Sequence, residues 1–129
     1  MAPPPIDRLD HLVLTVASVD ASVAFYTRVL GFAKTTFDAD RIGLSFGSQR
    51  INLHPVGSAI KPRATRPTPG SADLCFVTAA AIEEVMAHLS VCGVAIVAGP
   101  VRRTGALGPM TSVYFRDPDG NLVEVANYA

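Results

Sequence analysis

The residue that most clearly indicates a chemical role is Glu124, which stands between Val123 and Val125 in an apolar stretch near the C-terminus. A carboxylate in such a strand either faces solvent or is buried with a partner, and a metal ion would be such a partner. His54 lies two residues after Asn52, so in a strand both side chains would point to one face. Imidazoles and carboxylates bind divalent metals and transfer protons. These residues indicate a metal or acid–base site.

Basic and aromatic residues further along the chain are candidates for substrate binding. Arg102 and Arg103 are adjacent in a segment predicted to be a loop. They could hold a substrate carboxylate as a bidentate fork, or lie exposed to solvent. Tyr114 and Phe115 alternate across a predicted strand, so one ring would face the ligand, although core packing explains either ring as well. His88 lies off the apolar face of a predicted helix, and a solvated position is expected for it.

The elements that must position these residues form two copies of one pattern, a strand, a helix and three strands. In the first copy, Ser18 or Asp20 caps the helix and Gly31 ends it. Its strands are predicted at residues 9–16, 35–37, 42–46 and 50–54. In the second copy, Thr78 caps the helix and Gly93 ends it. Its strands are predicted at residues 72–77, 94–97, 112–115 and 122–126, with a long loop at 99–109 and a turn at 117–121.

A segment rich in Pro and Gly, residues 56–70, separates the two copies and has the composition of a linker. The first module then covers residues 8–55 and the second 71–128, within a single domain of residues 1–129. Each module alone would be an open sheet with one apolar face, so the two must pack together. We therefore expect an α+β fold of two βαβββ modules, a pair of mixed-sheet half-barrels around a central ligand-binding cleft.

Composition and charge exclude several classes of protein. With 49% hydrophobic and 17% charged residues, the chain is globular rather than disordered. Eleven basic residues balance eleven acidic ones, so nothing favours nucleic acid or an anionic membrane as partner. No apolar run approaches the ~20 residues of a membrane span, and no secretory signal is visible. Cys75 and Cys92 are too few for a disulfide scaffold, so we expect ordinary thiols in the cytoplasm.

Three sequence segments carry a family resemblance: DHLVLTV at 10–16, FYTRVLGF at 25–32 and YFRDPDGNLVEV at 114–125. In this order they resemble the vicinal oxygen chelate superfamily, which contains glyoxalases, bleomycin resistance proteins and extradiol dioxygenases. The resemblance covers nearly the whole chain. NLH at 52–54 and PTPGSADL at 67–74 are similar to the glyoxalase-domain-containing protein 5 subgroup, often labelled lactoylglutathione-lyase-like.

The resemblance implies metal ligands on the first and last strands of each module. Those positions hold His11 and Asp73 on the first strands, and Asn52 and Glu124 on the last. Asn52 and Asp73 depart from the glutamate and histidine that the family commonly has there. The implied ligands are His11, His54 and Glu124, with Asp73 as a fourth, for Zn, Ni, Mn, Co or Fe(II). The expected substrate-binding residues are Asn52, Arg102, Arg103 and Tyr114.

The function implied is a metal-dependent, glyoxalase-like lyase or isomerase of the lactoylglutathione-lyase type. It would act on a small substrate chelated through adjacent oxygens, with Glu124 as the base. Two alternatives stay open: an extradiol-type dioxygenase using Fe(II) at the same residues, and a metal-free binding protein of the bleomycin-resistance kind. Superfamily members are usually dimers and open sheet edges favour pairing, so a homodimer is expected.

Overall fold

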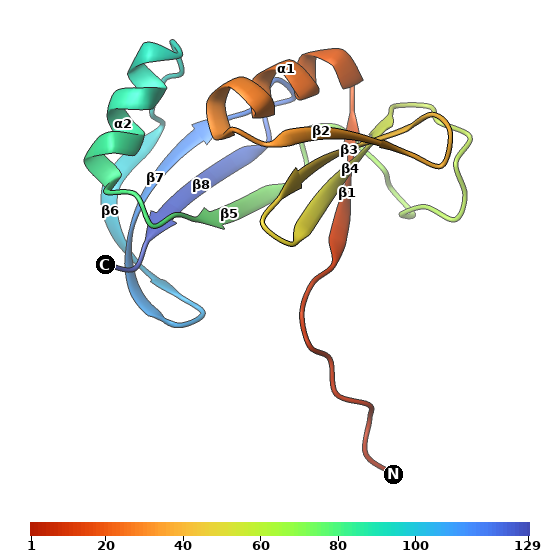
Figure 1. Ribbon diagram of the computed structural model, residues 1–129, viewed down its shortest axis with the longest axis horizontal. Helices are drawn as coiled ribbons and strands as arrows, with labels where there is room; N and C mark the ends of the chain where they lie inside the picture. The colour runs from red at the N-terminus through yellow and green to blue at the C-terminus, as the bar shows by residue number, and fades with distance from the viewer.

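The computed structural model describes all 129 residues and repeats one order of elements twice (Figure 1). The first module comprises β1 (His11–Val16), α1 (Val19–Leu30), β2 (Ala33–Phe37), β3 (Arg41–Phe46) and β4 (Gln49–Pro55). The second comprises β5 (Asp73–Val77), α2 (Ile82–Val91), β6 (Ala98–Gly105), β7 (Gly108–Arg116) and β8 (Leu122–Asn127). The predicted fold of two βαβββ modules is confirmed. Neither helix is long and apolar enough to cross a membrane.

Each module forms its own four-stranded mixed sheet. Sheet A has the order β1-β4-β3-β2 and sheet B has the order β5-β8-β7-β6. In both sheets the first strand pairs in parallel with the last, and the other pairings are antiparallel. Neither sheet closes into a barrel.

Both helices lie on the same side of the sheets in Figure 1, which leaves the other side without a helix. Because side chains alternate along a strand, each sheet has a helix face and an open face. The helix face of sheet A supplies core residues such as Leu14, Leu44 and Ile51, and that of sheet B supplies Val113 and Phe115. The strand register places these residues on the open face of sheet A: His11, Val13, Thr15, Gly43, Arg50, Asn52 and His54.

Local signals at the helix ends explain α1 better than α2. The Ser18 hydroxyl accepts a hydrogen bond from the backbone N–H of Ala21 at 3.1 Å, and Gly31 ends the helix with φ of 70°. Both assignments confirm the predictions. The predicted Thr78 cap of α2 is wrong, because the N-cap is Ala81, which makes no side-chain capping bond. The helix begins later in the chain than the hydroxyl that was expected to cap it.

The prediction of a long loop at 99–109, in the same module, is also wrong. Residues 98–105 form strand β6, which pairs with β7 as a hairpin. The strand predicted at 94–97 is also wrong, because those residues connect α2 to β6 without forming a strand. β6 is the edge strand of sheet B, where Pro and Gly are tolerated. A register shift between Ala98 and Val101 accommodates Gly99, whose φ is +103°. The Gly and Pro residues therefore mark an irregular edge strand rather than a loop.

The turn between β7 and β8 joins α1 to the second module. The Asp117 carboxylate accepts hydrogen bonds from the Tyr26 hydroxyl and from the Asn121 side-chain amide, both at 2.8 Å. It also accepts from the backbone N–H groups of Asp119 and Asn121 at 2.9 Å each. Burial, reinforced by the Asp117 charge, raises the pKa of the Tyr26 hydroxyl, so it remains a donor.

The same turn also holds the first strand of each module. Asn121 Oδ1 accepts from the Ala72 backbone N–H at 2.9 Å, just before β5. Asp119 Oδ1 accepts from the Ala17 backbone N–H at 3.0 Å, just after β1. These bonds fix the relative position of the two sheets.

Candidate functional site

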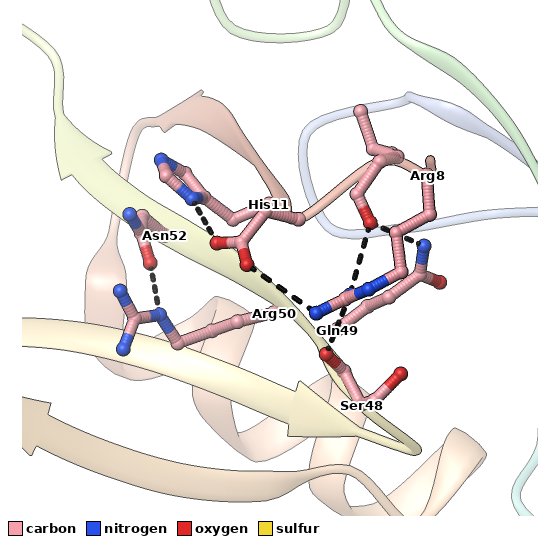
Figure 2. A network of polar contacts seen from close by, with 8 residues as sticks. Arg8, His11, Ser48, Gln49, Arg50 and Asn52 are labelled. Atoms are coloured by element: carbon pink, nitrogen blue, oxygen red, sulfur yellow. Dashed lines mark hydrogen bonds and ion pairs between the residues drawn. The ribbon is translucent and has the colours of Figure 1, made fainter. Parts of the chain in front are cut away.

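His11 stands at the start of β1 with one ring nitrogen already bonded. Its Nδ1 lies 2.8 Å from Asp10 Oδ2, and Figure 2 shows the ring beside Asn52. The hydrogen bond from His11, followed by the Arg8 and Arg50 charges, lowers the pKa of Asp10. An anionic Asp10 fixes the proton on Nδ1 and leaves Nε2 with a free lone pair. This tautomer suits a metal ligand or a general base.

Arg50 and Asn52 occupy the neighbouring strand on the same face. Arg50 lies opposite His11 in the parallel register, and its Nε donates to Asn52 Oδ1 at 2.7 Å (Figure 2). The guanidinium carbon is 3.8 Å from the centre of the Phe37 ring. Asn52 was expected to contact substrate or metal, but its oxygen already accepts from a cation. The adjacent guanidinium therefore disfavours a metal ion at this oxygen.

His54 does not join His11, although both lie on the open face of sheet A. The register pairs His54 with Thr15, four residues beyond His11, which corresponds to about 13 Å along the strand. Two ligands of one ion lie much closer together than this. Burial and then the Arg41 charge lower the pKa of His54, so it is neutral near pH 7.

A pocket adjoins His54 rather than His11 or Glu124. It has a volume of about 190 Å³ and lies where the ends of β1 and β4 meet the linker. Val13, Thr15 and His54 line it from the strands, and Arg63 and Arg66 line it from the linker. This pocket is therefore not a central cleft between His11 and Glu124.

Glu124 lies on the open face of sheet B and is only 9% exposed. The Ser112 hydroxyl donates to Glu124 Oε2 at 2.6 Å, which fixes the carboxylate and leaves Oε1 without an N–H or O–H donor. Cys75 lies directly opposite Glu124 on β5. Burial and then the Glu124 charge raise the pKa of the Cys75 thiol to about 11, so it is protonated near neutral pH. The site thus contains a carboxylate with two uncharged hydrogen-bonding neighbours.

Two more candidates accompany Glu124 on this face. Tyr114 lies opposite Glu124 on β7, and Asp73 is two residues before Cys75 on β5. Arg103 Nε donates to the Tyr114 hydroxyl at 3.0 Å, so it shares the open face. Arg102 points to the opposite face, because adjacent residues of a strand alternate. The two arginines therefore cannot form the expected joint fork.

The candidates thus fall into two groups on two sheets. His11, Asn52 and His54 belong to sheet A, whereas Asp73, Glu124, Tyr114 and Arg103 belong to sheet B. No three His, Cys, Asp or Glu side chains of the chain gather closely enough to hold a metal ion. His11 and Glu124 therefore lie on different sheets of the single chain.

Sequence reasoning missed three residues of these groups. Arg50 precedes Asn52 by two positions, so strand alternation alone would have placed both on the face of His54. Ser112 and Cys75 could not be found in this way, because their proximity to Glu124 depends on the register of three strands. No signal in the sequence sets that register.

Comparison with known proteins agrees with this architecture. The family model described as "Glyoxalase/Bleomycin resistance protein/Dioxygenase superfamily" matches residues 8–125. The chain is 53% identical to "Virulence protein STM3117" of Salmonella typhimurium, over 95% of this chain and 85% of that protein. It is 50% identical to "Glyoxalase domain-containing protein RDO1" of Mycosarcoma maydis, over 93% and 68%. The solved structure of an integron cassette protein from V. cholerae superposes with a TM-score of 0.97 at 51% identity, covering 99% of this chain and 100% of that one.

The chain therefore belongs to the glyoxalase/bleomycin resistance protein/dioxygenase superfamily. Members of this superfamily bind small molecules, often with a divalent metal ion and often as dimers. The names of the two relatives above specify no reaction.

Proposed function

We propose that this protein is a metal-dependent lyase or isomerase of the glyoxalase kind, with a site completed by a second copy of the chain. The observation that carries the proposal is the way His11 and Glu124 are held. Asp10 fixes one nitrogen of His11, and Ser112 fixes one oxygen of Glu124. Each residue therefore presents one free, oriented donor atom on an open face.

The residues fit a divalent ion in part. His11 and Glu124 have free donor atoms. Asp73 is an exposed carboxylate two residues before Cys75, which lies opposite Glu124. Nitrogen and carboxylate donors suit Zn, Ni, Mn or Fe(II). Asn52 and His54 do not fit, because Asn52 is bonded to Arg50 and His54 lies four residues beyond His11.

The chemistry follows from the position of Glu124. A bound divalent ion would act as a Lewis acid on adjacent substrate oxygens. Glu124 would serve in turn as metal donor and as base, because the same free oxygen would accept a proton from one substrate carbon and return it to the next. Ser112 and Cys75 would hold the carboxylate in place during both transfers, because both keep their protons near neutral pH and can donate hydrogen bonds.

A homodimer supports this proposal because it would join the two groups of residues. The open face of sheet A carries Arg50 and His11, and that of sheet B carries Glu124 and Asp73. Neither face is covered by a helix (Figure 1). A twofold dimer would repeat each A–B contact, because such an interface is isologous.

Metal-dependent stabilisation tests the proposal. The chelator-treated protein should gain thermal stability on addition of Zn, Ni or Mn, by about 2.7 kcal/mol when the metal is at 100 times its Kd. The gain should be lost in Glu124→Gln, which keeps the shape but removes the charge, and in His11→Gln, which removes the imidazole. Glu84→Gln, on the exposed surface of α2, is the matched control and should behave as the wild type. A Glu124→Gln variant that gains normal thermal stability on addition of metal would refute the assigned site.

A metal-free binding protein is the second candidate, and one observation favours it. Arg50 already places a cation against the oxygen of Asn52, which opposes a second positive charge there. The metal content of protein purified without chelator separates the possibilities. Zn, Ni or Mn would support the lyase, iron would support a dioxygenase, and binding of a ligand without any metal would support this second candidate.

A further inference from the structure

Arg50 is held across the open face of sheet A by three neighbours on three strands. Asn52 on β4 accepts from its Nε at 2.7 Å, and the Phe37 ring on β2 lies 3.8 Å from its guanidinium carbon. Between them, Gly43 on β3 makes room for the aliphatic part of the side chain. A Cβ on Gly43 would lie 2.7 Å from Arg50 Cδ and 3.0 Å from Cγ. The side chain is therefore fixed over the sheet rather than extended into solvent.

This arrangement leaves one edge of the guanidinium free. The Nε edge is bonded to Asn52 and one planar face lies on Phe37, whereas the two terminal nitrogens have no hydrogen-bond partner in the protein. Asp10, the carboxylate on which the Arg50 charge acts, is already bonded to His11 and paired with Arg8 at 3.7 Å. A paired edge of two N–H donors matches the two oxygens of a carboxylate or phosphate.

We propose that Arg50 is the anchor for an anionic oxygen group of the small-molecule ligand, most directly a carboxylate. The site consists of the free edge of Arg50, beside Asn52, on the open face of sheet A (Figure 2). The fixed guanidinium loses little conformational entropy when it binds, which favours recognition at this position over the other exposed arginines. This inference deepens the proposed function by naming the substrate class, but it does not require a metal or catalysis.

The test is titration of the chelator-treated protein with succinate, followed by the NMR signals of the Arg50 Nε–H and the Asn52 amide. Succinate should shift both signals with saturation, whereas succinamide, of equal length and no charge, should not. Inorganic phosphate forms a second arm: tighter binding of phosphate than of succinate would assign the site to phosphate esters. Arg50→Gln should weaken binding of the preferred anion about tenfold or more, as loss of a charge-assisted pair predicts.

Two variants separate the position of the cation from its charge. Gly43→Ala keeps every charge but displaces the Arg50 side chain, so it should weaken binding several-fold while the melting temperature changes little. Arg41→Gln removes the same charge from β3 on the same face and should bind within about twofold of wild type, because a single charge at a distance is screened by salt.

Equal weakening by Arg41→Gln and Arg50→Gln would overturn the proposal, since binding would then follow net charge alone. Normal binding by a folded Gly43→Ala variant together with normal binding by Arg50→Gln would overturn it as well. Failure of the metal and Glu124 experiments would leave these measurements unaffected. The two proposals can therefore fail independently.

Discussion

Cys75 and Glu124 share one environment on the open face of sheet B, and this has a measurable effect on the thiol. The thiolate is the reactive form of cysteine, and burial beside a carboxylate disfavours it. The pKa of Cys75 is raised from 9.0 to about 11. At pH 8 its thiolate fraction is therefore about 100-fold lower than that of an unperturbed thiol.

Alkylation by iodoacetamide should accordingly be slow at pH 8 and rise steadily to about pH 11. The rate can be measured by mass spectrometry in a Cys92→Ser background, so that only one thiol reacts. Glu124→Gln should move the midpoint toward lower pH, because it removes the neighbouring charge. A midpoint near pH 9 in the Cys92→Ser protein that keeps Glu124 would contradict the contact between Cys75 and Glu124.

At the same scale, the sequence predicted the important residues better than their partners. Glu124 was identifiable because a carboxylate between two valines in an apolar strand needs a partner. The partner, Ser112, comes from another strand, and its contact depends on a register that no local pattern encodes. His54 was placed on the correct face, but the four-residue offset from His11 also depends on register.

At the scale of elements, β6 shows how an irregular edge strand depends on one glycine. Gly99 has φ of +103°, and a Cβ there would lie 2.5 Å from the Ser112 carbonyl oxygen. Gly99→Ala should therefore combine backbone strain with a backbone clash, and destabilise the fold by roughly 2 kcal/mol or more.

Gly108→Ala is the matched control for this prediction. Its φ is also positive, at +129°, but a Cβ would meet nothing within 4 Å. Thermal unfolding of both variants should show a larger loss of stability for Gly99→Ala. Equal losses would mean that strain alone operates and that the close approach of β6 to Ser112 is not maintained.

Also at this scale, the contact between α1 and the β7–β8 turn should contribute strongly to stability. Tyr26→Phe removes a buried donor to a charged acceptor, which predicts a loss of about 1.5–3 kcal/mol. Tyr128→Phe removes an exposed hydroxyl that accepts from the Leu107 N–H at 3.2 Å, so it should have a much smaller effect. Urea unfolding of both variants makes the comparison, and equal effects would contradict the assigned role of Asp117.

The sequence predicted most elements but not the hairpin of β6 and β7. Alternating apolar residues and helix caps mark the first module clearly, and α1 begins and ends where the capping residues indicate. The Gly and Pro residues of 99–109 indicate a loop by composition, yet sheet B provides an edge that tolerates them. Tertiary context therefore determines the strand there.

At the scale of the whole molecule, a site shared between two copies predicts that two inactive variants restore metal binding when they form mixed dimers. Neither His11→Gln nor Glu124→Gln should bind metal with normal stabilisation, because each homodimer would lack one donor at both sites. When the two variants are unfolded together and refolded as a mixture, the mixed dimers should contain one intact site. If subunits pair at random, about a quarter of the wild-type sites would return.

Metal binding measured by calorimetry before and after mixing tests this expectation. A control mixture of His11→Gln with itself, treated in the same way, should recover nothing. Light scattering should report a dimer at micromolar concentration in every sample. A monomer, or a mixture without recovery, would place the two donors in unrelated sites.

The turn at 117–121 has a further consequence for how the protein comes apart. It bonds to α1, to the chain after β1 and to the chain before β5, while α1 itself packs residues into both hydrophobic cores. Neither module can lose its structure without exposing groups that the other has buried. Despite its internal duplication, the chain should therefore melt as a single cooperative unit, with equal calorimetric and van't Hoff enthalpies. The repeat is visible in the architecture but should be invisible in the thermodynamics.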